Sequence, residues 1–150
     1  MTHLDRAIVD VVESICSSVL GFDVVETASP AAVTGPGLIA RTQVAGAWSG
    51  SVVVWCDDGF ADACAAVLFD GEVCGPPEAR DALGELTNII AGDAKNRLIQ
   101  KGYKFEIGLP KMVTGRNYIT AQSKSVPCIV VSFTSQIGKF CLEVSLRKAG

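Results

Sequence analysis

A carboxylate and a carboxamide stand three positions apart, at Glu85 and Asn88, within a segment that the sequence predicts to be helical. Residues three apart on a helix are neighbours, with Cβ atoms about 5–6 Å from each other, so both side chains can enter one site. A carboxylate can pair with a cation. A carboxamide both donates and accepts hydrogen bonds, which suits it to orient a water molecule. The spacing therefore predicts a polar site on one face of one helix.

Two further residues extend this pair into a stripe. At about 100° per residue, Asp81, Glu85, Asn88 and Gly92 fall on one side of the helix. The opposite side carries the apolar residues Leu83, Leu86, Ile90 and Ala94. Thr87 and Asn88 are poor helix formers, and Gly92 costs about 1 kcal/mol relative to alanine. The stripe is a candidate functional surface. The alternatives are ordinary solvation and the preference of acidic residues for a helix N-terminus.

Other catalytic arrangements find little support in the composition. His3 is the only histidine, which leaves no Ser–His or Cys–His pair and few transition-metal sites. The six cysteines show no CxxC spacing, and three of them, Cys56, Cys128 and Cys141, lie in apolar runs. We interpret the cysteines as buried free thiols. No metal site and no cofactor of the protein's own is predicted.

Charge is divided unevenly along the chain. Residues 1–92 contain 3 Lys or Arg and 13 Asp or Glu, whereas residues 93–150 contain 10 and 3. The basic part begins at Lys95, close to the stripe. It either attracts an acidic or phosphorylated partner or complements the negative end of the helix dipole. The acidic pI of 5.1 and the low aromatic content of 7% argue against nucleic-acid binding.

The stripe has to be positioned by the elements around it. The hydrophobic pattern predicts helices at 3–20, 59–69 and from Pro76 to near Gly102, and strands at 22–29, 37–46, 48–56, 103–109, 112–122, 127–135 and 138–147. This order predicts a two-layer α+β fold, in which the long helices pack on a mostly antiparallel sheet. It also predicts two similar halves, each with a long helix followed by strands. We expect one domain over 1–150. Without an apolar run that could span a membrane and without a signal-peptide pattern, a cytoplasmic protein is expected, with no membrane insertion.

The segment Glu85-Leu-Thr-Asn88-Ile-Ile-Ala-Gly-Asp-Ala-Lys resembles the signature of the CheC/CheX/FliY family of response-regulator phosphatases. That signature has Asp or Ser, three residues, Glu, two residues, Asn, and a proline about twenty residues later. Asp81, Glu85 and Asn88 match its first three positions, and Pro110 matches the proline, whose role would be structural. The first helix has Cys16 where an asparagine is required after Glu13. One intact site per chain resembles CheX more than CheC.

The resemblance implies an aspartyl-phosphate phosphatase whose substrate is a phosphorylated CheY-like response regulator with Mg2+ bound by its receiver domain. Asn88 would orient the hydrolytic water, and Glu85 would pair with a lysine of the receiver. Asp81 would be a peripheral partner contact. Independently of the resemblance, the basic charge that begins at Lys95 makes this lysine a candidate partner contact, and the helix geometry suggests that Gly92 leaves room for the partner. The resemblance also implies a homodimer, formed by pairing of sheet edges.

Two other functions remain as alternatives. One is a non-catalytic module that binds a response regulator or a flagellar component through the same helix. The other is an unrelated small-molecule or metal-dependent enzyme, which a deep pocket away from residues 81–92 would favour. Turnover of a phosphorylated receiver would distinguish the phosphatase from the binding module.

Overall fold

The structure is a computed structural model that describes residues 3–21, 25–26, 37–69, 76–113, 128–135 and 138–148. Its elements in chain order are α1 (His3–Ile15), η1 (Cys16–Leu20), β1 (Val25–Glu26), β2 (Leu38–Gly46), β3 (Trp48–Cys56), α2 (Asp58–Leu68), α3 (Pro76–Ile99), β4 (Phe105–Ile107), β5 (Lys111–Val113), β6 (Cys128–Ser135) and β7 (Gly138–Lys148). The predicted order of helices and strands is confirmed. The strands expected at 22–29 and 112–122 lie partly outside the described residues.

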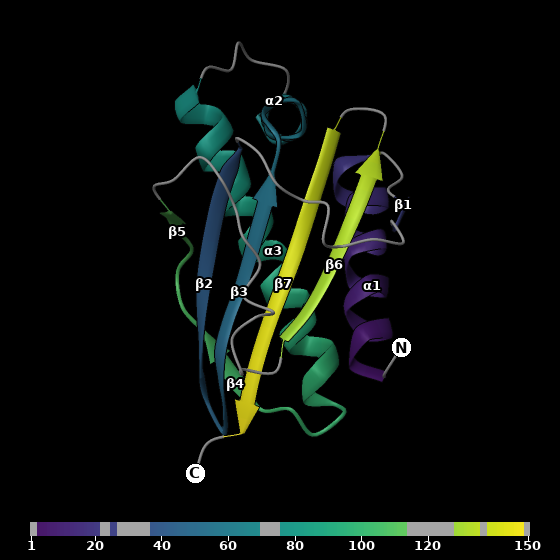
Figure 1. The fold of residues 1–150 in the computed structure, drawn as a ribbon, viewed down its shortest axis with the longest axis vertical. Coiled ribbons are helices and arrows are strands. Elements are labelled where there is room, and N and C mark those ends of the chain that lie inside the picture. Colours follow the sequence, from purple (N-terminus) through teal and green to yellow (C-terminus); the bar gives the residue numbers. More distant parts are fainter. Residues whose placement is uncertain are drawn as a thin grey trace.

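The described strands form one antiparallel sheet. Its seven strands have the order β1-β6-β7-β3-β2-β4, and β5 pairs with β2 along the same edge as β4. Figure 1 shows the helices together on one face of this sheet. The predicted two-layer α+β architecture is therefore confirmed. None of the helices in the described ranges is long and apolar enough to cross a membrane.

The register of the sheet places alternate residues toward the helices. Val52 pairs with Val144 and Val54 with Leu142, and all four are buried. Trp55, which belongs to the alternate set, pairs with Ile39 on one side and Cys141 on the other, and these three form a separate small cluster. The core between the layers thus comes from the alternating pattern that predicted the strands.

The first helix ends differently from its prediction. The predicted helix over 3–20 is α-helical only to Ile15, and η1 continues it as a π-helix. Both Cys16 and Leu20 remain buried through this wider turn. Gly21 then ends the segment with a φ of 78°, a left-handed conformation that glycine adopts without steric strain. Periodicity predicted the length of this segment but not the change in its winding.

The two predicted halves are visible in the element order. α1 with η1 precedes β1, β2 and β3, and α3 precedes β4, β5, β6 and β7. The short helix α2 lies between the halves and packs on both α3 and η1. In Figure 1, α1 lies along the β6 side of the sheet, and α3 crosses diagonally behind β2, β3 and β7.

The described cysteines are free and buried, as predicted. They are Cys16, Cys56, Cys64 and Cys141, while the side chains of Cys74 and Cys128 lie outside the described residues. Burial raises the pKa of the Cys16 and Cys64 thiols to about 12. Because the thiolate is the nucleophile, such groups are unreactive at neutral pH. These thiols act as small apolar side chains of the core.

Asp57 joins the start of α2 to the start of β7. Its carboxylate accepts hydrogen bonds from the backbone N–H groups of Phe60 and Lys139, each at 2.9 Å. The first bond is the N-cap of α2, and the second spans most of the chain. A Cβ at Gly138 would overlap this carboxylate, so the start of β7 requires glycine beside Asp57. One side chain therefore connects the two halves.

We predict that Asp57→Ala lowers the free energy of unfolding by about 2 kcal/mol, because an N-cap and a second hydrogen bond are lost together. Urea denaturation followed by circular dichroism measures the change. Asp58→Ala is the matched control, since Asp58 is exposed in the first turn of α2 and its loss should cost less than about 1 kcal/mol. Equal destabilisation by the two substitutions would contradict the role of Asp57.

Candidate functional site

Helix α3 is fixed by its apolar side. It starts at Pro76, where proline is tolerated because the first helical N–H groups have no partner within the helix. Its buried residues are Ala79, Ala82, Leu83, Leu86, Thr87, Ile90, Ala91, Ala94 and Leu98. They pack on β2 and against α1 and α2. The remaining arc of the helix faces solvent.

The predicted stripe lies on that solvent-facing arc. Asp81 and Glu85 are exposed, and Asn88 and Gly92 are partly exposed. Within the described ranges, no hydrogen bond or ion pair holds the side chains of Glu85 and Asn88. The two groups are therefore available to a molecule that approaches α3 from outside. The predicted geometry of the stripe is confirmed.

Thr87 does not belong to this surface. Its side chain is fully buried, and its hydroxyl donates a hydrogen bond of 2.7 Å to the carbonyl oxygen of Leu83. A threonine that bonds back to the preceding turn satisfies its own polar group inside an apolar contact. The unusual helix composition at Thr87 is thus explained by packing, and only Asn88 and Gly92 remain as unfavourable helix residues on the exposed side.

Pro110 packs beside the stripe. A Cβ at Gly84 would lie 4.0 Å from Cγ of Pro110, so the proline ring sits against the helix one residue before Glu85. A Cβ at this distance would make an ordinary van der Waals contact with the ring, so the connection between β4 and β5 lies next to the helix at Gly84. Pro110 is more than twenty positions from Asn88 in the sequence, yet it borders the same surface. Its structural role stays a prediction, and its position is compatible with it.

Lys95 is held within the molecule. Its ammonium lies 2.6 Å from a carboxylate oxygen of Glu106 in β4, with the lysine side chain 26% exposed and the glutamate 82% exposed. The pair connects α3 to the edge of the sheet about two turns beyond Asn88. Lys95 already has a neighbour of opposite charge in Glu106. It is therefore not a free group waiting for a partner, and it does more than complement the helix dipole. Its role toward a partner stays a prediction.

The incomplete motif on the first helix does not form a second site. Glu13 is exposed, but Cys16 is buried in the core. The two side chains therefore point in different directions and cannot enter one pocket. This agrees with the sequence-based expectation of one site per chain.

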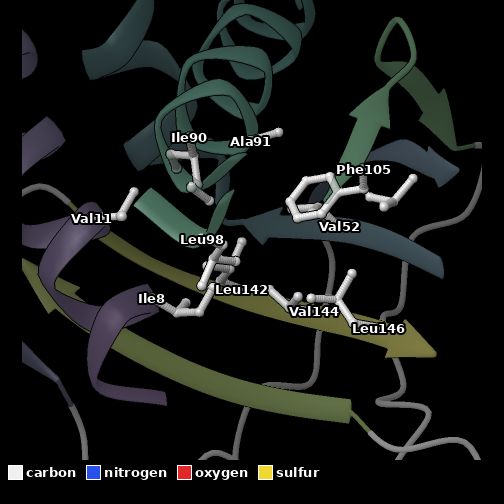
Figure 2. Close-up of a pocket in the computed structure, with 12 residues that line it drawn as sticks. Ile8, Val11, Val52, Ile90, Ala91, Leu98, Phe105, Leu142, Val144 and Leu146 are labelled. Atoms are coloured by element: carbon white, nitrogen blue, oxygen red, sulfur yellow. The ribbon is translucent and has the colours of Figure 1, made fainter. Parts of the chain in front are cut away.

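A cavity lies between the two layers, away from the stripe. Figure 2 shows its lining, which includes Ile8, Ile90, Phe105 and Leu142 from the helices and strands on either side. Its volume of about 10 Å³ has room for at most one water molecule, and its walls are apolar. It cannot hold a substrate. Among the described residues, no group of three or more His, Cys, Asp or Glu is arranged to bind a metal ion.

Three features of this site were not predicted from the sequence. They are the Lys95–Glu106 pair, the contact of Pro110 with Gly84, and the exposure of Leu109. The first two join residues that lie on different elements. The periodicity of side chains within one helix or strand does not predict such contacts. The glycine at 84, beside a motif glutamate in mid-helix, was the one local signal, because glycine there disfavours the helix.

Comparisons with known proteins agree with this arrangement. The family model described as chemotaxis phosphatase CheX matches residues 38–134, a range that contains the whole stripe and Pro110. No curated protein matches the chain.

Several solved structures have a similar fold. CheX from Vibrio vulnificus is 21% identical over 97% of both chains, with a TM-score of 0.83. CheX from Desulfovibrio desulfuricans is 20% identical over 97% of this chain and 100% of its own, with a TM-score of 0.79. A chain in the CheX–CheY–BeF3–Mg2+ complex from Borrelia burgdorferi is 19% identical over 95% of this chain and 97% of its own, with a TM-score of 0.70. At these identities the structures establish the fold. The family model matches well over half of the sequence, and the chain therefore belongs to the CheX family of chemotaxis phosphatases.

Proposed function

We propose that this protein hydrolyses the aspartyl phosphate of a CheY-like response regulator, in chemotaxis or a related two-component pathway. The observation that carries the proposal is the Glu85–Asn88 pair on the solvent-facing side of α3, whose side chains have no partner among the described residues and lie within the segment that the CheX family model matches. The complex from Borrelia burgdorferi contains a similar chain together with CheY, BeF3 and Mg2+. A protein substrate also suits a site that lies on an open helix face and not in a pocket.

The enzyme has to accelerate this reaction only modestly. A water oxygen attacks the phosphorus, the bond to the aspartyl oxygen breaks, and inorganic phosphate and a free carboxylate are formed. Acyl phosphates hydrolyse unaided, so an acceleration of about a hundredfold, or about 2.7 kcal/mol, is a useful gain. Positioning of the water can supply this amount without a nucleophile of the enzyme's own. Mg2+ held by the receiver domain would neutralise charge on the phosphoryl group.

Asn88 is the residue that we assign to the water. A carboxamide offers an acceptor oxygen and two N–H donors, so it can hold a water in line with the bond that breaks and contact a phosphoryl oxygen as well. No bond within the described residues has to be broken before Asn88 can do this. Its place near the middle of a packed helix fixes the backbone from which the carboxamide projects.

Glu85 is the residue that we assign to docking. Its exposed carboxylate lies one turn before Asn88 and can pair with a lysine of the receiver. Such a pair becomes desolvated as the two proteins meet, which strengthens it relative to a pair in water. Glu85 would therefore set the register in which Asn88 reaches the phosphoryl group.

The remaining stripe residues have supporting roles in this proposal. Asp81 lies at the N-terminal end of the stripe as a peripheral contact. Lys95 lies at the other end, where its pairing with Glu106 limits it to a contact at the rim. Gly92 would allow the receiver to approach the helix closely. We also include homodimerisation in the proposal, through β1 or through β4 and β5, which are the edges of the sheet among the described strands.

We predict that Asn88→Ala loses about a hundredfold in turnover, because the water is no longer oriented. The decay of phosphorylated receivers from the same genome, measured with substoichiometric amounts of the protein, tests this. Asn96→Ala is the matched control, since Asn96 is an exposed asparagine further along α3. Wild-type turnover by Asn88→Ala would refute the assignment. Binding without turnover by the wild type would favour the non-catalytic module.

For Glu85→Ala we expect binding of a BeF3-loaded receiver to weaken at least tenfold, because a charge pair worth more than about 1.4 kcal/mol is lost. Isothermal titration at two salt concentrations measures the affinity and its electrostatic part. Glu13→Ala, which removes an exposed glutamate from α1, serves as the control and should bind as the wild type does. Unchanged affinity for Glu85→Ala would exclude the docking role.

Gly92 gives a prediction that separates stability from function. A Cβ built at Gly92 meets nothing within 4 Å, so nothing in the described structure requires glycine there. Gly92→Ala should therefore raise the free energy of unfolding by about 0.5–1 kcal/mol. Gly92→Leu should be at least as stable as the wild type yet bind the receiver more weakly, because its side chain fills the space that the partner needs.

Urea denaturation and receiver binding, measured on the same preparations, test both statements. Gly50→Ala is a contrasting control, since a Cβ there would overlap the carbonyl oxygen of Ser145 and should destabilise the protein. Wild-type receiver binding by Gly92→Leu would contradict the clearance role of Gly92.

A further inference from the structure

The connection between β4 and β5 carries an unusually exposed leucine. Leu109 is 84% exposed, whereas the other exposed large hydrophobic side chains among the described residues, Val19, Val67 and Ile99, are 38–44% exposed. A single exposed apolar side chain is common on protein surfaces and needs no function by itself. The surroundings of Leu109 are what distinguish it.

Leu109 is fixed from both sides. The N–H of Gly108 donates a hydrogen bond of 2.9 Å to the carbonyl oxygen of Gln43 in β2. Pro110, whose ring restricts its own φ, packs against Gly84 of α3. The flanking strands β4 and β5 both pair with β2. The exposure of Leu109 therefore does not come from a loose loop, because the backbone on either side of it is anchored.

The position of Leu109 follows from two contacts that this connection makes with α3. Glu106 pairs with Lys95, and Pro110 packs against Gly84, so the chain runs antiparallel to the helix along the flank of the stripe. Gly84 and Lys95 are about 16 Å apart along the helix axis, and an extended chain covers about 13 Å from Glu106 to Pro110. These lengths match. Leu109 thus lies beside the helical turn that ends at Asn88.

We infer that Leu109 is the apolar docking residue of this surface, and that it enters an apolar part of the receiver domain when Glu85 and Asn88 engage the phosphorylation site. This inference rests on the proposed function. The stripe itself offers a carboxylate, a carboxamide and a glycine, which give orientation but little apolar contact. A few well-buried residues usually carry most of the binding energy of an interface, and burial of an apolar side chain on docking is favourable. Leu109 supplies such a side chain, and Pro110 holds it in place.

The test compares Leu109→Ala with the wild type on a receiver that the wild type dephosphorylates. We expect the KM for the phosphorylated receiver, and the dissociation constant for the same receiver loaded with BeF3 and Mg2+, to rise about tenfold. The kcat should stay within about twofold, because Leu109 does not touch the reacting atoms. Leu109→Met, which keeps an apolar side chain, should retain most of the wild-type affinity for the receiver. Val67→Ala, which removes an exposed apolar side chain from α2, should change none of these values.

Each other outcome overturns the inference in a recognisable way. Unchanged KM and binding in Leu109→Ala, with an active wild type, would make Leu109 an ordinary surface leucine and leave the proposed function intact. A shift in oligomeric state with an unchanged KM would assign the leucine to contact between copies of this chain. A drop in the free energy of unfolding that accounts for the loss of activity would make its role structural. A wild type that neither binds nor dephosphorylates any receiver would remove the proposed function, and this inference with it.

Discussion

The apolar side of α3 packs onto β2 and against α1 and α2, and this contact determines which side chains of the helix a partner can reach. Rotation of the helix by one residue, about 100°, would bury Glu85 and expose a leucine. The buried arc extends continuously from Ala79 to Leu98, so the helix has one orientation on the sheet. Every functional statement about the stripe depends on that orientation.

A site that lies on the outside of a helix has particular physical properties. It offers a partner no enclosed volume and few desolvated groups of its own, so catalysis has to be completed by the surface that docks on it. Burial of the interface on docking lowers the local dielectric constant and strengthens the polar contacts that Glu85 and Asn88 can make. Under the proposed function, a helix face with a carboxylate and a carboxamide could therefore support hydrolysis of an activated phosphate once the receiver has docked on it.

The flank of the stripe is formed by contacts between segments that are distant in the sequence. Lys95 pairs with Glu106, and Pro110 packs on Gly84, so the edge of the sheet follows the helix for about three turns. An exposed ion pair adds little to stability, and β4 is held beside the helix mainly by its pairing with β2 and by buried Phe105. At the other end of the sheet, Asp57 connects α2 to the start of β7. These few contacts give the surface around α3 a defined shape.

The sequence by itself determined the elements and the identity of the candidate pair. Apolar, β-branched runs bounded by glycine and proline predicted β2 and β3, and the period of 3.6 predicted α1. The helical wheel placed Asp81, Glu85, Asn88 and Gly92 on one exposed side of α3, because side-chain direction in a regular element depends only on local geometry. The tertiary structure alone decided that Thr87 is buried, that Lys95 pairs with Glu106, that Pro110 borders the stripe, and that Leu109 projects beside it. These facts depend on how segments that are distant in the sequence pack together, and the periodicity within a single helix or strand does not predict such packing.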